Sequence, residues 1–181
     1  MKCAIVATVL LGLYLAPALG LVNPDLNQQT TIVVGPQILT LKRQWHVAVI
    51  EKKSTVGAWK TVWNYRTGVT ATRMPSERVC YISTMNRQLV PTFDALPRLV
   101  EQNRIQGVKG QPSQDIIYVI KRPILNLEVY GQEVVTLCSG LTTYETYEVH
   151  GPQYTVDQGL CTKINVLHLL DFVFCRANNK A

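Results

Sequence analysis

The first twenty residues carry the pattern of a secretory signal peptide, and export decides how the rest of the chain is interpreted. Lys2 is followed by an apolar run from Ala4 to Leu15. Small residues, Ala18 and Gly20, then occupy the −3 and −1 positions of a cut after Gly20. The run is shorter than the roughly 20 apolar residues that a membrane anchor needs. We therefore expect a protein secreted through the ER and Golgi, with no stable membrane anchor.

Four cysteines remain after the expected cleavage: Cys80, Cys138, Cys161 and Cys175. Export places them in an oxidising compartment, where an even number favours two disulfides. Four cysteines allow three pairings, and their spacing does not choose among them. A metal site built from Cys161, His168 and Cys175 fits none of the standard ligand spacings. We expect a crosslinked fold with no metal and no cofactor.

The basic excess of the chain is unevenly distributed. Residues 21–122 hold 14 basic and 6 acidic side chains (+8), whereas residues 123–181 hold 3 basic and 6 acidic ones (−3). The two parts can neutralise each other within one fold, or the basic part can attract a polyanion such as mucin glycans. The basic residues form no run of five or more, so nucleic acid is not an expected partner.

Alternating β-branched and aromatic residues predict an antiparallel meander in the first half of the chain. Its expected strands are residues 30–34, 38–41, 45–50, 59–65, 69–73 and 79–84. The remaining expected elements are helices at 94–102 and 125–138, strands at 116–120 and 164–175, and a turn-rich stretch at 141–160. Pro97 fits the first turn of its helix. We predict an α+β fold in which two helices flank a central antiparallel sheet of about five strands.

No arrangement of residues indicates catalysis. None of the three histidines lies beside a serine or cysteine in a nucleophile motif. The segment Gly107–Gly110 lacks the spacing and the preceding strand of a phosphate-binding loop. We therefore expect a protein that acts by binding and is not an enzyme.

An ordered set of short motifs resembles the BRICHOS domain family. The set comprises Trp63-Asn64-Tyr65, Gly68, Ala71-Thr72-Arg73, Cys80, Met85-Asn86, Pro91, Leu96, Leu137-Cys138, Gly140 and Thr143-Tyr144. The end of the signal and the tail with Cys161 and Cys175 resemble the gastrokine branch, within which we expect a third paralogue. The expected division is a signal peptide (1–20), an N-terminal strand region (21–52), a BRICHOS-like domain (53–146) and a C-terminal extension with the second disulfide (147–181).

The resemblance implies which cysteines pair and singles out one position. It implies that Cys80 pairs with Cys138 and Cys161 with Cys175. It also places an aspartate where this chain has Asn64. A partly buried aspartate has a raised pKa and acts as a pH-sensitive strut, so we predict that this chain lacks that titration. The alternative is that the amide of Asn64 simply keeps the same hydrogen bonds.

The resemblance also implies a function. BRICHOS proteins resemble small chaperones that hold β-prone segments in an extended form, and the gastrokine branch implies gastric mucosal protection and restraint of epithelial growth. We therefore expect a β-prone peptide or protein client. The aromatic residues expected to contact it, unless they belong to the core, are Trp45, Trp59, Trp63 and Tyr65. The competing expectation is a signalling or mucin-binding factor that contacts an epithelial surface component and uses the fold as a scaffold.

Overall fold

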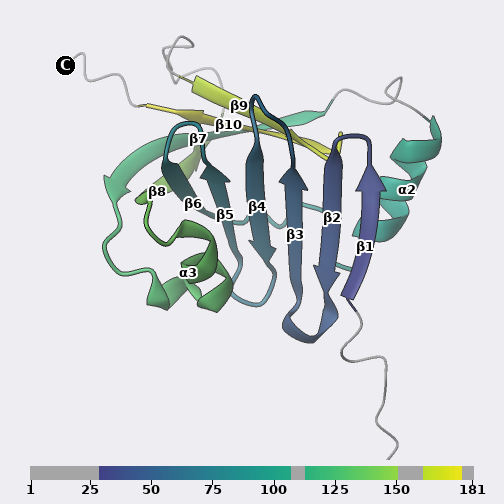
Figure 1. The fold of residues 1–181 in the computed structure, drawn as a ribbon, viewed down its shortest axis with the longest axis horizontal. Coiled ribbons are helices and arrows are strands. Elements are labelled where there is room, and N and C mark those ends of the chain that lie inside the picture. Colours follow the sequence, from purple (N-terminus) through teal and green to yellow (C-terminus); the bar gives the residue numbers. More distant parts are fainter. Residues whose placement is uncertain (1–28, 107–112, 151–160, 177–181) are drawn as a thin grey trace, which may run out of the picture.

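The computed structural model describes residues 29–106, 113–150 and 161–176, which form one mixed sheet with two helices (Figure 1). The ten strands of this sheet follow the order β1-β2-β3-β4-β5-β6-β8-β7-β10-β9. None of the helices in the described ranges has the length and apolar character that a bilayer span requires. The expected signal peptide at 1–20 and the loop at 107–110 lie outside the described residues.

The first six strands form the predicted antiparallel meander, in which each strand pairs with the next. They are β1 (Gln29–Val34), β2 (Gln37–Lys42), β3 (Val47–Lys52), β4 (Trp59–Asn64), β5 (Val69–Met74) and β6 (Val79–Thr84). Short turns join them, and Gly68 supplies the left-handed backbone (φ +70°) that the turn between β4 and β5 requires. The short helical turn η1 (Arg43–Trp45) lies between β2 and β3.

The second half of the chain corrects the predicted sheet. Its strands are β7 (Gln114–Pro123), β8 (Thr142–Val149), β9 (Cys161–Val166) and β10 (Leu170–Cys175). Strand β8 lies between β6 and β7 and runs parallel to β6, and β10 runs parallel to β7. The prediction of about five strands, all antiparallel, is therefore wrong: the sheet has ten strands and two parallel joints.

Two predicted segments of this half were also wrong. The stretch at 141–160 was expected to be turns, yet its first part forms β8 because threonine, tyrosine and valine there suit a pleated strand. The run at 164–175 was expected to be one strand, yet it is a hairpin of β9 and β10. Leu167 and His168 reverse the chain with φ of +57° each. Leu167 is apolar and buried in the core, so the hydropathy of the sequence does not mark this turn.

The two helices pack on opposite faces of the sheet. Helix α2 (Leu96–Gln106) has Pro97 in its first turn, as predicted. The second helix was expected over 125–138, but Gly131 adopts φ +94° and ψ 160°, which no α-helix accommodates. The segment therefore divides into a short turn, η2 (Glu128–Tyr130), and α3 (Gln132–Cys138).

Each face of the sheet has its own apolar core. On the inner face, Leu96 and Val100 of α2 belong to a cluster with Trp63, Tyr118 and Phe172. The outer face is the one that α3 covers in part, and its cluster includes Val49, Val62, Ala71, Val134 and Leu137. The curl of the sheet encloses the inner face, whereas part of the outer face beside α3 stays open (Figure 1).

The curl brings the two ends of the sheet together at a buried amide. The Gln37 side chain, at the start of β2, donates from Nε2 to the Asn165 carbonyl on β9 (3.1 Å). Its Oε1 accepts from the Leu167 N–H (2.8 Å). Gln37 is 4% exposed, so these bonds are shielded from water and fix the distance between the N-terminal and C-terminal ends of the sheet.

Candidate functional site

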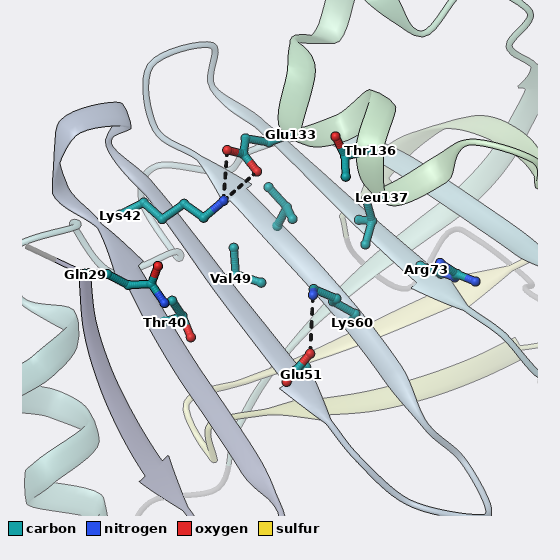
Figure 2. Close-up of a pocket in the computed structure, with 11 residues that line it drawn as sticks. Gln29, Thr40, Lys42, Val49, Glu51, Lys60, Arg73, Glu133, Thr136 and Leu137 are labelled. Atoms are coloured by element: carbon teal, nitrogen blue, oxygen red, sulfur yellow. Dashed lines mark hydrogen bonds and ion pairs between the residues drawn. The ribbon is translucent and has the colours of Figure 1, made fainter. Parts of the chain in front are cut away.

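A groove of about 310 Å³ lies on the outer face of the sheet beside α3 (Figure 2). Its lining residues are Gln29, Thr40, Lys42, Val49, Glu51, Lys60, Val62, Arg73, Glu133, Thr136 and Leu137. They come from the first five strands and from α3, so the meander supplies the base of the groove and the helix one wall. The groove is the part of the outer face that the short α3 leaves uncovered.

The register of the meander sets which side chains meet in the groove. Glu51 lies opposite Lys60, and Lys60 lies opposite Arg73, which places a charged row across three strands. The next row along the same face contains Val49 opposite Val62. Because alternate residues of a strand point to the same face, the groove has an apolar base and a charged rim.

Most of the charges on this rim are paired. Lys42 Nζ lies 3.0 Å from both carboxylate oxygens of Glu133, so it ties β2 to the first turn of α3. Glu51 bonds Lys53 (3.2 Å) and Lys60 (3.3 Å). Burial alone would raise the pKa of Glu51, but these two lysines hold it below its usual value. Glu51 and Glu133 are therefore charged groups that hold the rim together.

Strand β1 borders the groove and forms one edge of the described sheet. Its sequence, QTTIVV, contains no charge and no proline. Gln29, Thr31 and Val33 alternate along the outer face and are exposed, with Val33 59% accessible. An edge strand presents backbone N–H and C=O groups that can pair with another extended chain, and β1 has none of the charges that usually discourage such pairing.

Strand β9 forms the other edge and is differently built. Lys163 extends from it to Asp115 on β7 (3.0 Å) and to Asp171 on β10 (2.9 Å). The Cys161–Cys175 disulfide joins β9 to β10. This edge thus carries both a charge and a covalent link.

The expected client contacts separate into two groups. Trp63 (0% exposed), Trp59 (5%) and Tyr65 (8%) belong to the inner core, and the Tyr65 hydroxyl donates to the Pro91 carbonyl (2.8 Å). Their burial favours the alternative that these three residues belong to the core. Trp45 is 46% exposed in η1, and Lys42 Nζ, at the end of the groove, lies 5.6 Å from its ring centroid. Trp45 stays a predicted contact.

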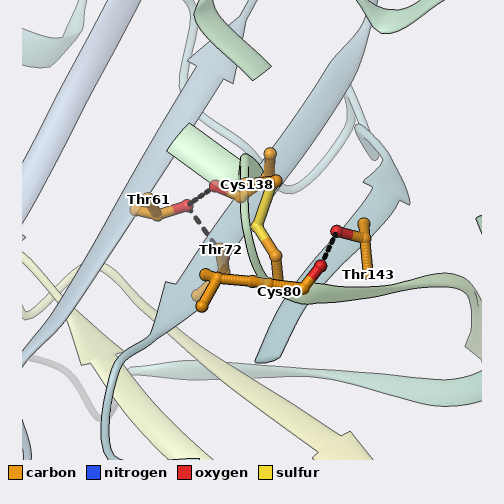
Figure 3. Close-up of a disulfide and its surroundings, with 7 residues drawn as sticks. Thr61, Thr72, Cys80, Cys138 and Thr143 are labelled. Atoms are coloured by element: carbon orange, nitrogen blue, oxygen red, sulfur yellow. Dashed lines mark hydrogen bonds between the residues drawn. A yellow bond between two sulfur atoms is a disulfide. The ribbon is translucent and has the colours of Figure 1, made fainter. Parts of the chain in front are cut away.

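Both disulfides have the pairing that the resemblance implies. Cys80–Cys138 joins β6 to the last residue of α3 (Figure 3), and Cys161–Cys175 closes the β9–β10 hairpin. The first bridge fixes the wall of the groove to the sheet. Among the described residues, no three histidine, cysteine or acidic side chains gather as metal ligands.

Asn64 ends β4 and closes the turn that follows. Its Oδ1 accepts hydrogen bonds from the N–H groups of Arg66 and Thr67, both at 3.1 Å. The side chain is buried, with Nδ2 lying 3.7 Å from the point where a Cβ would stand on Gly131. The amide therefore closes this turn by hydrogen bonding, without a titrating group.

Comparison with known proteins places this arrangement in a family. The model of the BRICHOS domain matches residues 55–145. Gastrokine-1 of Sus scrofa is 30% identical and gastrokine-1 of Homo sapiens 28% identical, each with 97% of both chains covered. Gastrokine-3 of Mus musculus is 24% identical, with 97% of this chain and 92% of the relative covered. The third paralogue therefore stays a prediction, and no solved structure gives a significant match. The chain belongs to the BRICHOS domain family and, within it, to the gastrokines.

Proposed function

We propose that this gastrokine-family protein binds extended, β-prone segments at the β1 edge and thereby delays their aggregation. The observation that carries the proposal is an uncharged, exposed edge strand beside an open groove with an apolar base. The gastrokine likeness and the two disulfides are consistent with a secreted protein. The protein acts by contact and without chemical turnover.

The backbone of β1 supplies the first part of the binding. An added strand hydrogen-bonds to the free backbone groups of β1, which gives affinity for any segment that can extend. Its side chains then alternate between the two faces of the sheet. One set continues the exposed row of Thr31 and Val33, and the other lies toward α2, which contacts β1 on the inner face. Because backbone groups make these hydrogen bonds, binding favours any β-prone segment and does not depend on one particular sequence.

The groove supplies the second part. It reaches β3 and β4, two to three strands from the edge, which is about 10–15 Å at the spacing of paired strands. Three or four extended residues flanking the added strand span that distance. Val49, Val62 and Leu137 then offer apolar surface to them, and Trp45 lies beyond Lys42 at one end.

A fibril assay with matched variants tests the proposal. Residues 21–181 are added to an amyloid-forming peptide below equimolar ratio, and fibril growth is followed by dye fluorescence. Val33→Lys places a charge on the β1 edge and is expected to lose most of the delay. Val56→Lys, in the loop between β3 and β4 and 82% exposed, is the control and is expected to keep it. Equal delay by both variants contradicts the proposal.

The biological consequence belongs to the same proposal. Withholding β-prone segments from aggregation would protect the gastric mucosa and restrain epithelial growth, the roles that the gastrokine likeness suggests. We expect the wild type to slow proliferation of gastric epithelial cells and Val33→Lys to do so less. Equal effects would separate the growth role from client binding.

One observation favours a second function, the binding of acidic mucin glycans. Trp45 is exposed beside Arg43, and Arg66 Nη2 donates to the carbonyl of Gln44 in the same turn (3.1 Å). Among the described residues, neither arginine has an ion pair. An exposed indole with nearby cations suits a sugar ring that carries a carboxylate or sulfate. Saturable mucin binding without any delay of fibrils would support this function over the first.

A further inference from the structure

We propose that the groove selects clients that carry a carboxylate, and that Arg73 is the residue that binds it. The inference rests on the proposed function and names the class of client: an extended peptide with a glutamate or aspartate among apolar residues. It is carried by the charge pairing around the groove and by the side chains that surround Arg73.

Arg73 differs from the other cations that line the groove. Among the described residues it makes no hydrogen bond and no ion pair, and its Nε is buried without an acceptor. The other two cations that line the groove are neutralised, Lys42 by Glu133 and Lys60 by Glu51. Since no carboxylate of the described residues pairs with Arg73, an arriving carboxylate gains more there than at a lysine whose charge is already offset.

The strand register concentrates the excess positive charge around Arg73. Arg73 lies directly opposite Lys60 on the neighbouring strand, and like charges in that position repel. Lys60 shares its carboxylate, Glu51, with Lys53. The row and the adjoining Lys53 therefore carry three cations and one anion, and a client carboxylate would offset the remaining repulsion.

The groove fits a peptide carboxylate better than a free anion. A guanidinium presents a planar pair of N–H donors that matches both oxygens of a carboxylate. Leu137 lines the same groove (Figure 2), as does Val62, and both offer apolar surface to the stem of a glutamate and to its neighbours. A small inorganic anion would use the charge and leave this surface uncovered.

Two peptides that differ only at the end of one side chain, which is a carboxylate in one and an amide in the other, test the inference. One is an extended β-prone peptide with a single glutamate, and the other has glutamine in its place. Fluorescence anisotropy at low and physiological salt measures both affinities. The wild type is expected to bind the glutamate peptide about tenfold more tightly, with a preference that falls as salt rises. Arg73→Gln is expected to remove the preference and to keep the affinity for the glutamine peptide.

Two further variants make the test specific. Arg98→Gln removes the same charge from α2, on the other face of the sheet, and is expected to keep the preference. Glu51→Gln frees Lys60 and is expected to increase it. Equal affinity of the wild type for both peptides, or a preference that survives in Arg73→Gln, overturns the inference and leaves the proposed function standing. Failure of both peptides to bind overturns the two together.

Discussion

The two edges of the sheet meet solvent in opposite ways. Strand β1 is neutral, and its outer face is exposed along its length. Strand β9 is covalently tied to β10, and Lys163 crosses from it to Asp115 and Asp171. A sheet needs protection at both edges if it is only to stay monomeric. Protection at one edge alone is the arrangement that the proposed binding at β1 requires.

The difference extends to how each end of the sheet is held. Asp171 accepts hydrogen bonds from Ser113 (2.6 Å) and from Asn165, and it pairs with Lys163, so the β9–β10 end contains an ionised network. The β1–β2 end instead relies on the neutral amide of Gln37. We therefore expect the contacts that hold the β9–β10 hairpin to respond to acid and reductant, and the Gln37 hydrogen bonds to respond to neither.

The largest expected effect comes from removing the covalent link at the protected edge. The double variant Cys161→Ala/Cys175→Ala opens a loop with a separation of 14 residues. It is expected to lower the free energy of unfolding by about 3 kcal/mol and to increase self-association through β9. Urea unfolding and sedimentation measure the two effects. A loss below about 1 kcal/mol would contradict the role of this bridge in holding the edge.

Gln37→Ala removes the side chain that joins the two ends of the sheet and leaves the charge of both edge strands unchanged. The buried Leu167 N–H loses its acceptor, which is expected to cost about 2 kcal/mol. Gln88→Ala, at an exposed position beyond β6, is the control and is expected to change stability by less than about 0.5 kcal/mol. Similar losses in both variants would show that the amide does not hold the curl.

Asp171→Asn tests the ionised network, with an expected loss of about 1.5 kcal/mol at neutral pH. Burial would raise the pKa of Asp171, but hydrogen bonds from Ser113, Lys163 and Asn165 hold it below its usual 3.8. Its contribution is therefore complete above the unfolded pKa and is lost as pH falls through the lower folded pKa. Unfolding curves of wild type and variant should converge below about pH 4. A gap that stays constant in acid would contradict this.

Asn64→Asp places a titrating group at the end of β4 and has the smallest expected effect. Burial is expected to raise the pKa of the new carboxyl, so its destabilising effect appears as pH rises through that pKa. We expect a loss of about 1 kcal/mol at pH 8 that vanishes near pH 4. Stability scans of both proteins over pH 4–8 measure it, and identical profiles would show that the amide is no more than a neutral substitute.

The sequence allowed the first half of the fold to be predicted because its signals are local. Six short strands with turns between them pair in chain order, and Pro97 marks the start of a helix. The insertion of β8 between β6 and β7 has no local signature, since parallel partners lie far apart in the chain. The β9–β10 turn is equally hidden, because Leu167 and His168 reverse the chain without a glycine or proline.

The candidate site was harder to predict than the fold. Trp45 and Trp63 are alike in sequence terms, yet one is exposed in a turn and the other is fully buried. Only the placement of the strands distinguishes them. Arg73 was noticed as part of a family motif, but its lack of a partner depends on the strand register and on where α3 ends. Of the features that define the site, only the absence of charged residues in β1 can be seen directly in the sequence.

The position of β8 has a consequence for biosynthesis. The meander can fold hairpin by hairpin as the chain is translated, but β6 waits for a partner that is translated about sixty residues later. Until then β1 and β6 are the two edge strands of the partly formed sheet. Oxidation of Cys80 with Cys138 spans that same interval, so this disulfide and the β6–β8 pairing both wait for the same stretch of chain to be made. The unfinished sheet thus has a free strand edge at β6 that the completed fold covers with β8.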